Sequence, residues 1–352
     1  MTAATGSAPS AIRKITLKDA QATGTRALLL AGVPQEGARL QMELLLEAQL
    51  RGRASHGLLR LPRVIERIRK GVADPVTQGR REWQSDALLH VDGGQGLGPV
   101  VAWAALHQIM ERAKRTGVAV AAIRNNNHIG MLALYAEKVA ENGQVLIALT
   151  TSEALVHPWG GRMAMIGTNP IAIGVPAKPR PYVFDMATSL VSMGQVLVYA
   201  NRGQALEPGW ALDATGEPTT DASAARKGAI APFGGAKGYA LGLSFEVLVA
   251  ALTSSAIGRD VVGTLDSTQP CNKGDVFIVL EPAANVTAAI TDYLEALRDS
   301  PPATAARPVA VPGDRAHATR ERSVANGMEV AADVWDDICA LATSPTFEGS
   351  MK

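Results

Sequence analysis

Apolar positions recur along this chain with two periods, which separate helices from strands. Helical spacing predicts two helices within Ile15–Ala54, the second over Gln35–Gln49, and further helices at Arg60–Lys70, Pro99–Thr116, Gly238–Leu252, Val286–Asp299 and Ala316–Leu341. Short apolar runs predict strands at Leu88–Val91, Val118–Ile123, Val145–Thr151, Ile171–Val175, Tyr182–Met186 and Asp275–Leu280. Because helices alternate with short strands, the pattern indicates an α/β fold.

The composition of the chain argues against several classes of function. The chain has 352 residues, of which 47% are hydrophobic and 19% charged, values typical of a folded globular protein. A formal net charge of +1 lacks the basic excess of a nucleic-acid-binding protein, so no nucleic-acid partner is expected. No apolar run reaches the ~20 residues of a membrane span and Met1–Ser10 lacks a signal-peptide pattern, so we expect a cytoplasmic protein that does not bind membranes.

A glycine-rich loop lies between a predicted strand and a predicted helix, where a dinucleotide-binding loop would lie. It contains Gly94, Gly96 and Gly98. The Rossmann spacing requires a further glycine three positions on, where this chain has Pro99 or Val101. We therefore interpret the loop as a tight turn that positions the next helix, and an ordinary Rossmann fold is disfavoured.

Three of the six histidines, His56, His128 and His157, occur in polar breaks between regular elements, where functional side chains concentrate. His56 follows Ser55, whose hydroxyl could relay a proton to the imidazole. No two histidines lie within four residues of each other, and two cysteines exclude a Cys-based zinc site, so no metal is expected. The chain also lacks the G-x-S-x-G elbow of serine hydrolases.

Eight motifs resemble, in order along residues 15–330, the malate/L-lactate dehydrogenase family of the second type. That family includes sulfolactate and ureidoglycolate dehydrogenases and the ketimine reductases. The motifs are Ser55–Gly57, Asn126–Gly130, His157–Gly161, Ile166–Pro176, Phe184–Ser189, Pro218–Asp221, Pro232–Tyr239 and Pro312–Arg315. The run Thr151–Gly160 looks closest to the sulfolactate dehydrogenase branch.

This resemblance implies a non-Rossmann NAD(P)-binding α/β fold. A helical domain would be built from residues 1–75 and 313–352, and a nucleotide- and substrate-binding α/β domain from residues 76–312. The implied reaction is hydride transfer between NAD or NADP and a small, anionic 2-oxo/2-hydroxy acid. The alternative is NADPH-dependent reduction of a cyclic ketimine, piperideine- or pyrroline-2-carboxylate. The family also implies a homodimer whose partner subunit completes the cofactor site.

The resemblance carries roles to particular residues. His128 or His56 would supply the proton, with Ser55 as a relay to His56, and we favour His128 for a hydroxy acid. The planar guanidinium of Arg60 suits the substrate carboxylate. Thr168, Asn169, Met193 and Gly194 complete the expected substrate site. The expected cofactor contacts are His128, Ile129, Gly130, Met131 and Leu132 at the start of a helix, then Asp185, Met186, Ala187, Lys237, Gly313, Asp314 and Arg315.

One position departs from the family pattern. Many members carry Arg-Gly or His-Gly where this chain has Met193-Gly194, and a methionine cannot bind a second carboxylate. We therefore rank sulfolactate or a related 2-hydroxy acid first, malate or lactate second and a cyclic imine third. Arg60, Arg124 or Arg162 could bind a sulfonate.

Overall fold

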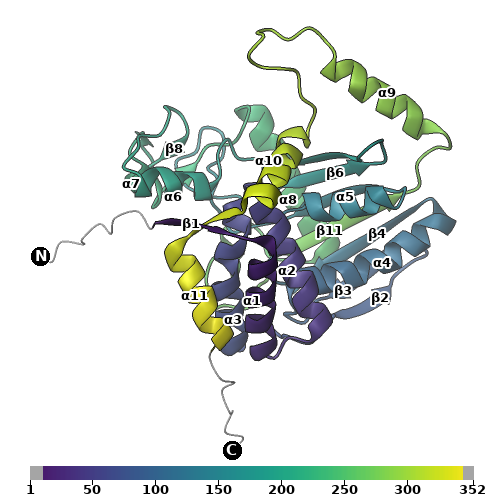
Figure 1. Cartoon of the computed structure of the whole chain (residues 1–352), viewed down its shortest axis with the longest axis horizontal. Coiled ribbons are helices and arrows are strands. Elements are labelled where there is room, and N and C mark those ends of the chain that lie inside the picture. The colour runs from purple at the N-terminus through teal and green to yellow at the C-terminus, as the bar shows by residue number, and fades with distance from the viewer. Residues whose placement is uncertain (1–10, 344–352) are drawn as a thin grey trace, which may run out of the picture.

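A seven-stranded mixed sheet forms the centre of the molecule (Figure 1). The computed structural model describes residues 11–343. In spatial order the strands are β2 (Arg80–Trp83), β3 (Leu88–Asp92), β4 (Val118–Arg124), β11 (Gly274–Leu280), β5 (Val145–Thr150), β6 (Ile171–Val175) and β7 (Tyr182–Met186). Only β3 and β4 are parallel; every other neighbouring pair is antiparallel. This topology confirms an α/β fold that is not a doubly wound Rossmann sheet.

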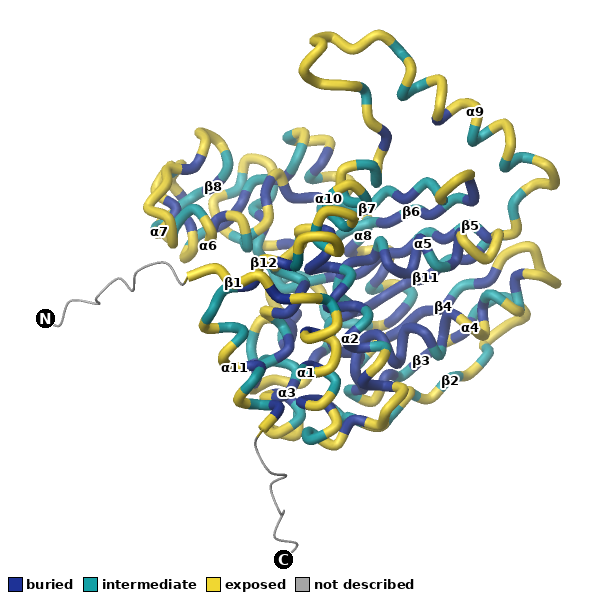
Figure 2. Tube along the Cα trace, in the orientation of Figure 1, coloured by how far each residue is buried: buried dark blue, intermediate teal, exposed yellow. Residues whose placement is uncertain are grey.

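Helices cover both faces of the sheet. α4 (Gly98–Thr116) and α5 (Ala133–Glu141) pack on one face and α8 (Ala236–Thr253) on the other. Proline near the start of α4 and left-handed Gly117 after its end are the residues that favour those helix boundaries. Figure 2 shows the continuous buried stretch along the sheet and α5. Within the described residues, α8 is the one helix long and apolar enough to span a membrane by those two criteria.

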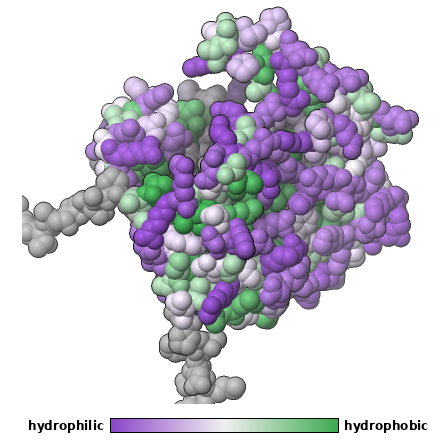
Figure 3. Space-filling view, viewed as in Figure 1, coloured by the Kyte–Doolittle hydropathy of each residue, from purple (hydrophilic) through white to green (hydrophobic). Residues whose placement is uncertain are grey.

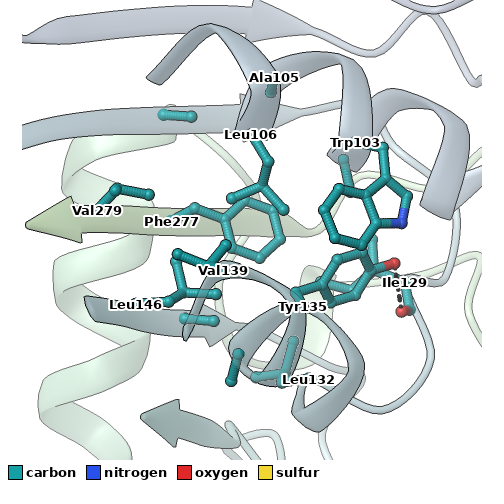
Figure 4. Packing of buried hydrophobic residues seen from close by; sticks show 14 of the residues in the cluster. Trp103, Ala105, Leu106, Ile129, Leu132, Tyr135, Val139, Leu146, Phe277 and Val279 are labelled. Atoms are coloured by element: carbon teal, nitrogen blue, oxygen red, sulfur yellow. Dashed lines mark hydrogen bonds between the residues drawn. The ribbon is translucent and has the colours of Figure 1, made fainter. Parts of the chain in front are cut away.

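The main core lies between the sheet and the α4–α5 pair (Figure 4). Phe277 on β11 and Tyr135 on α5 stack with ring centroids 5.5 Å apart, and Trp103 on α4 lies 5.3 Å from Tyr135. Phe277 and Tyr135 are fully buried. The Tyr135 hydroxyl donates to the Ile129 carbonyl oxygen at 2.9 Å, which satisfies the polar end of this side chain. The same core therefore holds the turn that follows β4.

The two ends of the described chain meet in a helical layer. It contains α1 (Leu17–Leu30), α2 (Gln35–Leu50), α3 (Leu61–Arg69), α10 (Asp314–Asn326) and α11 (Ala332–Thr343). β1 (Ile12–Ile15) pairs antiparallel with β12 (Met328–Ala331). The division into domains at residues 75 and 313 stays a prediction, and its residues 1–10 and 344–352 lie outside the described part.

The prediction of one terminal helix over Ala316–Leu341 is wrong. Gly327, at a φ of +83°, ends α10, and the next four residues form β12 before α11 begins. The left-handed backbone at Gly327 interrupts helical geometry, and pairing with β1 satisfies the extended backbone. Strand β1 supplies this pairing from more than 300 residues away, so local spacing could not reveal the break.

The remaining elements form a small lobe and an arm. The lobe holds α6 (Met193–Asn201), α7 (Ala222–Ala225) and a three-stranded sheet of β8 (Ala211–Leu212), β9 (Pro218–Thr219) and β10 (Ala229–Ile230). α9 (Val286–Arg298) extends from the sheet at the top of Figure 1 and is followed by an irregular segment, residues 300–312. Both cysteines are free thiols.

We expect Phe277→Ala to lower the free energy of unfolding by about 3–5 kcal/mol, because it removes a fully buried ring and leaves a cavity. Urea denaturation measures this change. The control is Tyr293→Ala on α9, whose side chain is 65% exposed and which we expect to change stability by at most about 0.5 kcal/mol. Equal effects of the two substitutions would contradict the assignment of the core.

Candidate active site

A turn of three asparagines leads from β4 to His128. Asn125, in a left-handed conformation, donates its amide to both Asp92 carboxylate oxygens at 3.1 and 3.2 Å. Asn127 donates to the Gln95 and Gly96 carbonyl oxygens at 2.6 and 2.9 Å. These bonds join the turn to the glycine loop and define the backbone that carries His128.

Asn126 ties the same turn to the centre of the sheet. Its amide donates to Asp275 Oδ2 at 3.1 Å, and Asp275 Oδ1 accepts from the Thr150 hydroxyl at 2.6 Å and from Lys273 Nζ. The exposed fraction is 0% for both Asn126 and Asp275 and 2% for Lys273. A buried carboxylate is tolerated only with such a set of donors, so this group orders β4, β5 and β11 behind His128.

Gly98 at the start of α4 lies directly against the His128 backbone. A Cβ at Gly98 would come within 2.1 Å of the His128 carbonyl oxygen, which leaves no room for any other residue. This contact supports the interpretation of the glycine loop as a structural turn.

His56 and His128 face each other across the site. Their ring centroids are 5.5 Å apart, and Ser55 Oγ lies 3.0 Å from His56 Nδ1. His56 ends a short 3₁₀ turn, Ala54–His56, and a second turn, Leu58–Arg60, leads into α3. His128 Nδ1 accepts from the Gly130 amide at 3.2 Å. The structure thus brings the three predicted catalytic residues together.

Both imidazoles are poor bases in this environment. Burial, with the charges of Arg60 and Arg53, lowers the pKa of His56 to about 4. Burial, followed by Arg60, His56 and Lys273, holds the pKa of His128 well below its usual value. Both rings are therefore neutral near pH 7.

Arg60 lies beside the two histidines. Its Nε donates to the Ser55 carbonyl oxygen at 2.8 Å and its Nη1 approaches the Thr264 carbonyl oxygen at 3.4 Å. Burial, with the neighbouring Arg63, lowers the pKa of Arg60 to about 10, so it stays charged at neutral pH. A half-buried cation bonded only to carbonyl oxygens retains donors for an anionic ligand.

The turn that carries Thr168 is fixed by hydrogen bonds to Ser152 and to α8. The Thr168 amide donates to Ser152 Oγ at 2.9 Å, and the two hydroxyl oxygens lie 3.2 Å apart. Asn169 is fully buried and donates to Glu246 Oε2 at 2.6 Å and to the Gly242 carbonyl oxygen at 3.1 Å. The Asn169 side chain therefore anchors the turn to α8 and leaves Thr168 half-buried, and a substrate contact of Asn169 stays a prediction.

Met193 and Gly194 form the first turn of α6, and Gly194 lies against Ser55. A Cβ at Gly194 would come within 2.9 Å of Ser55 Cβ. Ser192 caps this helix by accepting from the Gln195 amide at 3.1 Å. The start of α6 thus lies against Ser55, next to His56, and substrate contacts of Met193 and Gly194 stay a prediction.

The expected helix start at residues 128–132 needs correction. α5 begins at Ala133, whose amide donates to Asp185 Oδ2 at 2.8 Å. The loop before that helix consists of His128, Ile129, Gly130, Met131 and Leu132. Within it, the Gly130 amide donates to His128 Nδ1 and is not free for a ligand. Burial raises the pKa of Asp185, although the Ala133 amide opposes the shift. Asp185 therefore orients α5, with Met186 and Ala187 following it as half-buried residues.

The second expected cofactor segment lies beside β7. Gly313 has a φ of +100°, and a Cβ at this position would lie 3.3 Å from the Val183 carbonyl oxygen. Asp314 is not free for a ligand, because Arg298 donates to both of its oxygens at 2.9 and 3.0 Å. Arg315 is exposed. Lys237 is also exposed and lies in the first turn of α8.

A cavity of about 590 Å³ lies between α2, α5, α10 and the β6–β7 turn. Its inner wall is an ion-pair network in which Arg51 donates to Glu47 at 3.0 Å and to Glu137, and Arg320 donates to Glu47 at 2.7 Å. Burial opposes ionisation of Glu47, but Arg320 and Arg51 outweigh it and lower its pKa. Sequence reasoning missed this cavity, because its charged residues lie far apart along the chain.

No group of three or more His, Cys, Asp or Glu side chains suited to a metal ion occurs among residues 11–343. His157, the third histidine in a polar break, has its Nδ1 2.8 Å from the Pro158 carbonyl oxygen and lies outside the His56–His128 pair. Arg124 pairs with Asp92 at 3.3 Å and Arg162 with Glu217 at 2.7 Å, so two of the three arginines suggested for a sulfonate have partners elsewhere.

Known proteins resemble this chain over nearly its whole length. A dehydrogenase from Sinorhizobium meliloti has a TM-score of 0.92 and 49% identity, covering 95% of this chain and 99% of that one. Sulfolactate dehydrogenase from Methanocaldococcus jannaschii has a TM-score of 0.87 and 30% identity, covering 94% and 96%. Delta(1)-pyrroline-2-carboxylate reductase from Ancylobacter novellus is 32% identical, covering 89% and 93%.

The family model for malate/L-lactate dehydrogenase matches residues 15–339. This range contains all the motifs on which the resemblance was based, together with the His56–His128 pair and Arg60. The chain belongs to the malate/L-lactate dehydrogenase family of oxidoreductases.

Proposed function

We propose that this protein transfers a hydride between NAD or NADP and a small 2-oxo/2-hydroxy acid of the sulfolactate, malate or lactate type. The observation that carries the proposal is the pairing of His56 and His128, with ring centroids 5.5 Å apart, beside the half-buried cation of Arg60. A 2-hydroxy acid needs both features: a cation for its carboxylate and a proton-transfer group for its C2 oxygen.

In this proposal, each residue of the site has a separate role in binding or in proton transfer. Arg60 binds and orients the C1 carboxylate, which places the C2 oxygen toward the histidines. A neutral imidazole accepts the hydroxyl proton during oxidation and returns it during reduction. His128 remains our favoured proton-transfer residue, and taking up the hydroxyl proton at its Nδ1 would replace the hydrogen bond that this nitrogen accepts from the Gly130 amide. His56 is the alternative, since Ser55 offers its Nδ1 an exchangeable proton. Thr168 contributes a hydroxyl at the half-buried edge of the site.

The described residues fit a nicotinamide dinucleotide. The cavity of about 590 Å³ is within the usual range for ligand pockets, and its wall residue Arg51 is close enough to Asp185 to influence that carboxyl group. We propose that the loop 128–132, residues 185–187 and Gly313 line the cofactor, with Lys237 and Arg315 as exposed cations nearby. When bound, the nicotinamide supplies or accepts the hydride.

Reduction of a cyclic ketimine is the second candidate, since an imine carboxylate also needs Arg60 and a proton donor. A pyrroline-2-carboxylate reductase among the relatives favours keeping it. A substrate panel of sulfopyruvate, oxaloacetate, pyruvate and piperideine-2-carboxylate, each with NADH and NADPH, separates the two by absorbance at 340 nm. Turnover of the imine alone would replace the hydroxy-acid proposal.

We also propose a cytoplasmic homodimer with α8 at the interface. The exposed positions of α8 include Leu241, Val247 and Leu248, which are 40–56% exposed and recur at helical spacing along one face. The opposite face packs on the sheet through Val249 and carries Glu246 into hydrogen bonds. An apolar helix face of this kind suits a second copy of the chain. Figure 3 shows a largely hydrophilic face, with apolar groups gathered near β1, while α8 lies behind the sheet in this view.

We expect His128→Asn to lower kcat by at least about 100-fold, because it removes the proton-transfer group, while cofactor binding changes little. His56→Asn made in parallel identifies which ring transfers the proton. Steady-state kinetics and cofactor fluorescence titration measure the two effects. Wild-type turnover in the His128 variant would remove this residue from the mechanism.

The low pKa values of both imidazoles predict the pH dependence of hydroxy-acid oxidation. Because the low pKa leaves the imidazole deprotonated and ready to accept a proton, kcat/KM for oxidation should stay constant from about pH 8 down to about pH 5.5. The acid limb should fall near pH 4, the pKa of His56, if that ring transfers the proton, and well below the usual histidine pKa if His128 does. Initial rates across this range test it, and an acid limb near pH 6.5 would show that neither ring is desolvated in solution.

We expect Val247→Asp to weaken self-association by at least about tenfold, since it places an unpaired carboxylate in an apolar interface. Sedimentation velocity across a concentration series measures the effect. Val324→Asp on α10 is the matched control, because Val324 is also an exposed valine on a helix. A monomeric wild type would reject the dimer proposal.

A further inference from the structure

Arg53 stands between the large cavity and the histidine pair. It follows Arg51, which lines the cavity, and precedes His56 of the pair in the sequence. Between the two arginines, Gly52 has a φ of +74°, a backbone conformation that turns the chain after α2. The segment 51–56 therefore runs from one site to the other.

The guanidinium group of Arg53 has no partner within residues 11–343. The residue is exposed, and its side chain forms no hydrogen bond or ion pair in this part of the chain. Arg51 is, by contrast, buried and donates to Glu47 at 3.0 Å and to Glu137. A guanidinium group carries several N–H donors, so those of Arg53 are open to a ligand.

The charge of Arg53 acts on groups at both sites. Burial, Arg60 and Arg53 together lower the pKa of His56 to about 4. At the other site, burial raises the pKa of Asp185, near the end of β7, and the Ala133 amide and the charge of Arg53 oppose that shift. Because Coulomb interactions weaken with distance, Arg53 lies near both the histidine pair and the start of α5.

Backbone amides in this region already have acceptors. A helix N-terminus commonly binds the phosphates of a nucleotide. In this chain, however, the Asp185 carboxylate accepts from the amide of Ala133, the first residue of α5, at 2.8 Å. The Gly130 amide donates to His128 Nδ1 at 3.2 Å. These two amides are therefore not open to a phosphate, whereas the guanidinium group of Arg53 is.

We propose that Arg53 binds the diphosphate of the dinucleotide, where the cofactor passes from the large cavity to the histidine pair. This inference rests on the proposed function, which places a nicotinamide dinucleotide at the cavity and its reactive ring at the histidines. Arginine suits the role because its planar fork donates paired hydrogen bonds to phosphate oxygens. Its charge also offsets the repulsion between the phosphates and the nearby carboxylate of Asp185.

The test compares ligands with and without the diphosphate. NADH, or NADPH if it binds the wild type more tightly, contains the diphosphate, as does ADP-ribose or its 2′-phosphate. Dihydronicotinamide riboside has the same reactive ring and no phosphate. Fluorescence titration measures binding of the reduced dinucleotide to the full chain, and isothermal titration calorimetry measures binding of ADP-ribose. Initial rates give kcat/KM for the riboside even where its binding is too weak to titrate.

We expect Arg53→Gln to weaken binding of the dinucleotide and of ADP-ribose by about 10–100-fold, and to change kcat/KM for the riboside by less than about threefold. Arg53→Lys, which keeps the charge without the fork, should restore part of the affinity. Arg69→Gln is the matched control, because Arg69 is an exposed arginine in the last turn of α3. Circular dichroism verifies that each variant is folded.

The outcomes separate this inference from the proposed function. Unchanged dinucleotide and ADP-ribose binding in Arg53→Gln, or an equal loss of kcat/KM with the riboside, would overturn the role of Arg53 even in an active dehydrogenase. Absence of turnover with every acid and cofactor would reject the proposed function. The ADP-ribose titrations would then still decide: a loss in Arg53→Gln that Arg53→Lys partly restores supports a diphosphate site, and a wild type that does not bind ADP-ribose overturns it.

Discussion

The buried carboxylate of Asp275 is the constraint on which the site depends. It lies at the start of the central strand β11 and accepts from three side chains: Asn126 in the turn after β4, Thr150 at the end of β5, and Lys273 just before β11 itself. An unpaired carboxylate at this depth would cost several kcal/mol, so the donors must be present together. Since Asn126 lies two residues before His128, the same bonds that satisfy Asp275 also define where His128 stands.

The electrostatics of the site follow from burial and arginine charge. The protein surrounds His56 and His128, and Arg60 lies close to both, so neither ring readily accepts a proton from solvent. A bound acid anion would reduce the positive potential that the arginines create and make protonation of an imidazole easier. In the proposed mechanism, substrate binding and proton transfer are therefore coupled through the guanidinium group of Arg60.

Helix α8 connects the site with the outer surface. Its buried Glu246 accepts from the Asn169 side chain and from the Gly167 amide at 3.1 Å, which holds the turn before Thr168. At three positions of the same helix, Leu241, Val247 and Leu248, the side chains face outward and are apolar. A helix anchored by one buried carboxylate can thus present an apolar face without losing its position against the sheet.

The sequence by itself determined the elements with regular spacing, the absence of a Rossmann loop and the family. It also identified Ser55, His56, His128 and Arg60, because these residues lie in short contiguous motifs. Only the tertiary structure decided how polar side chains are used. Asn169 anchors α8, Asp185 orients α5, Asp314 pairs with Arg298, and Asn126 reaches Asp275 across 149 positions of sequence. The physical reason is that periodicity reports which face of an element is buried, whereas a hydrogen-bond partner is set by which distant strands and helices the fold brings within 3 Å.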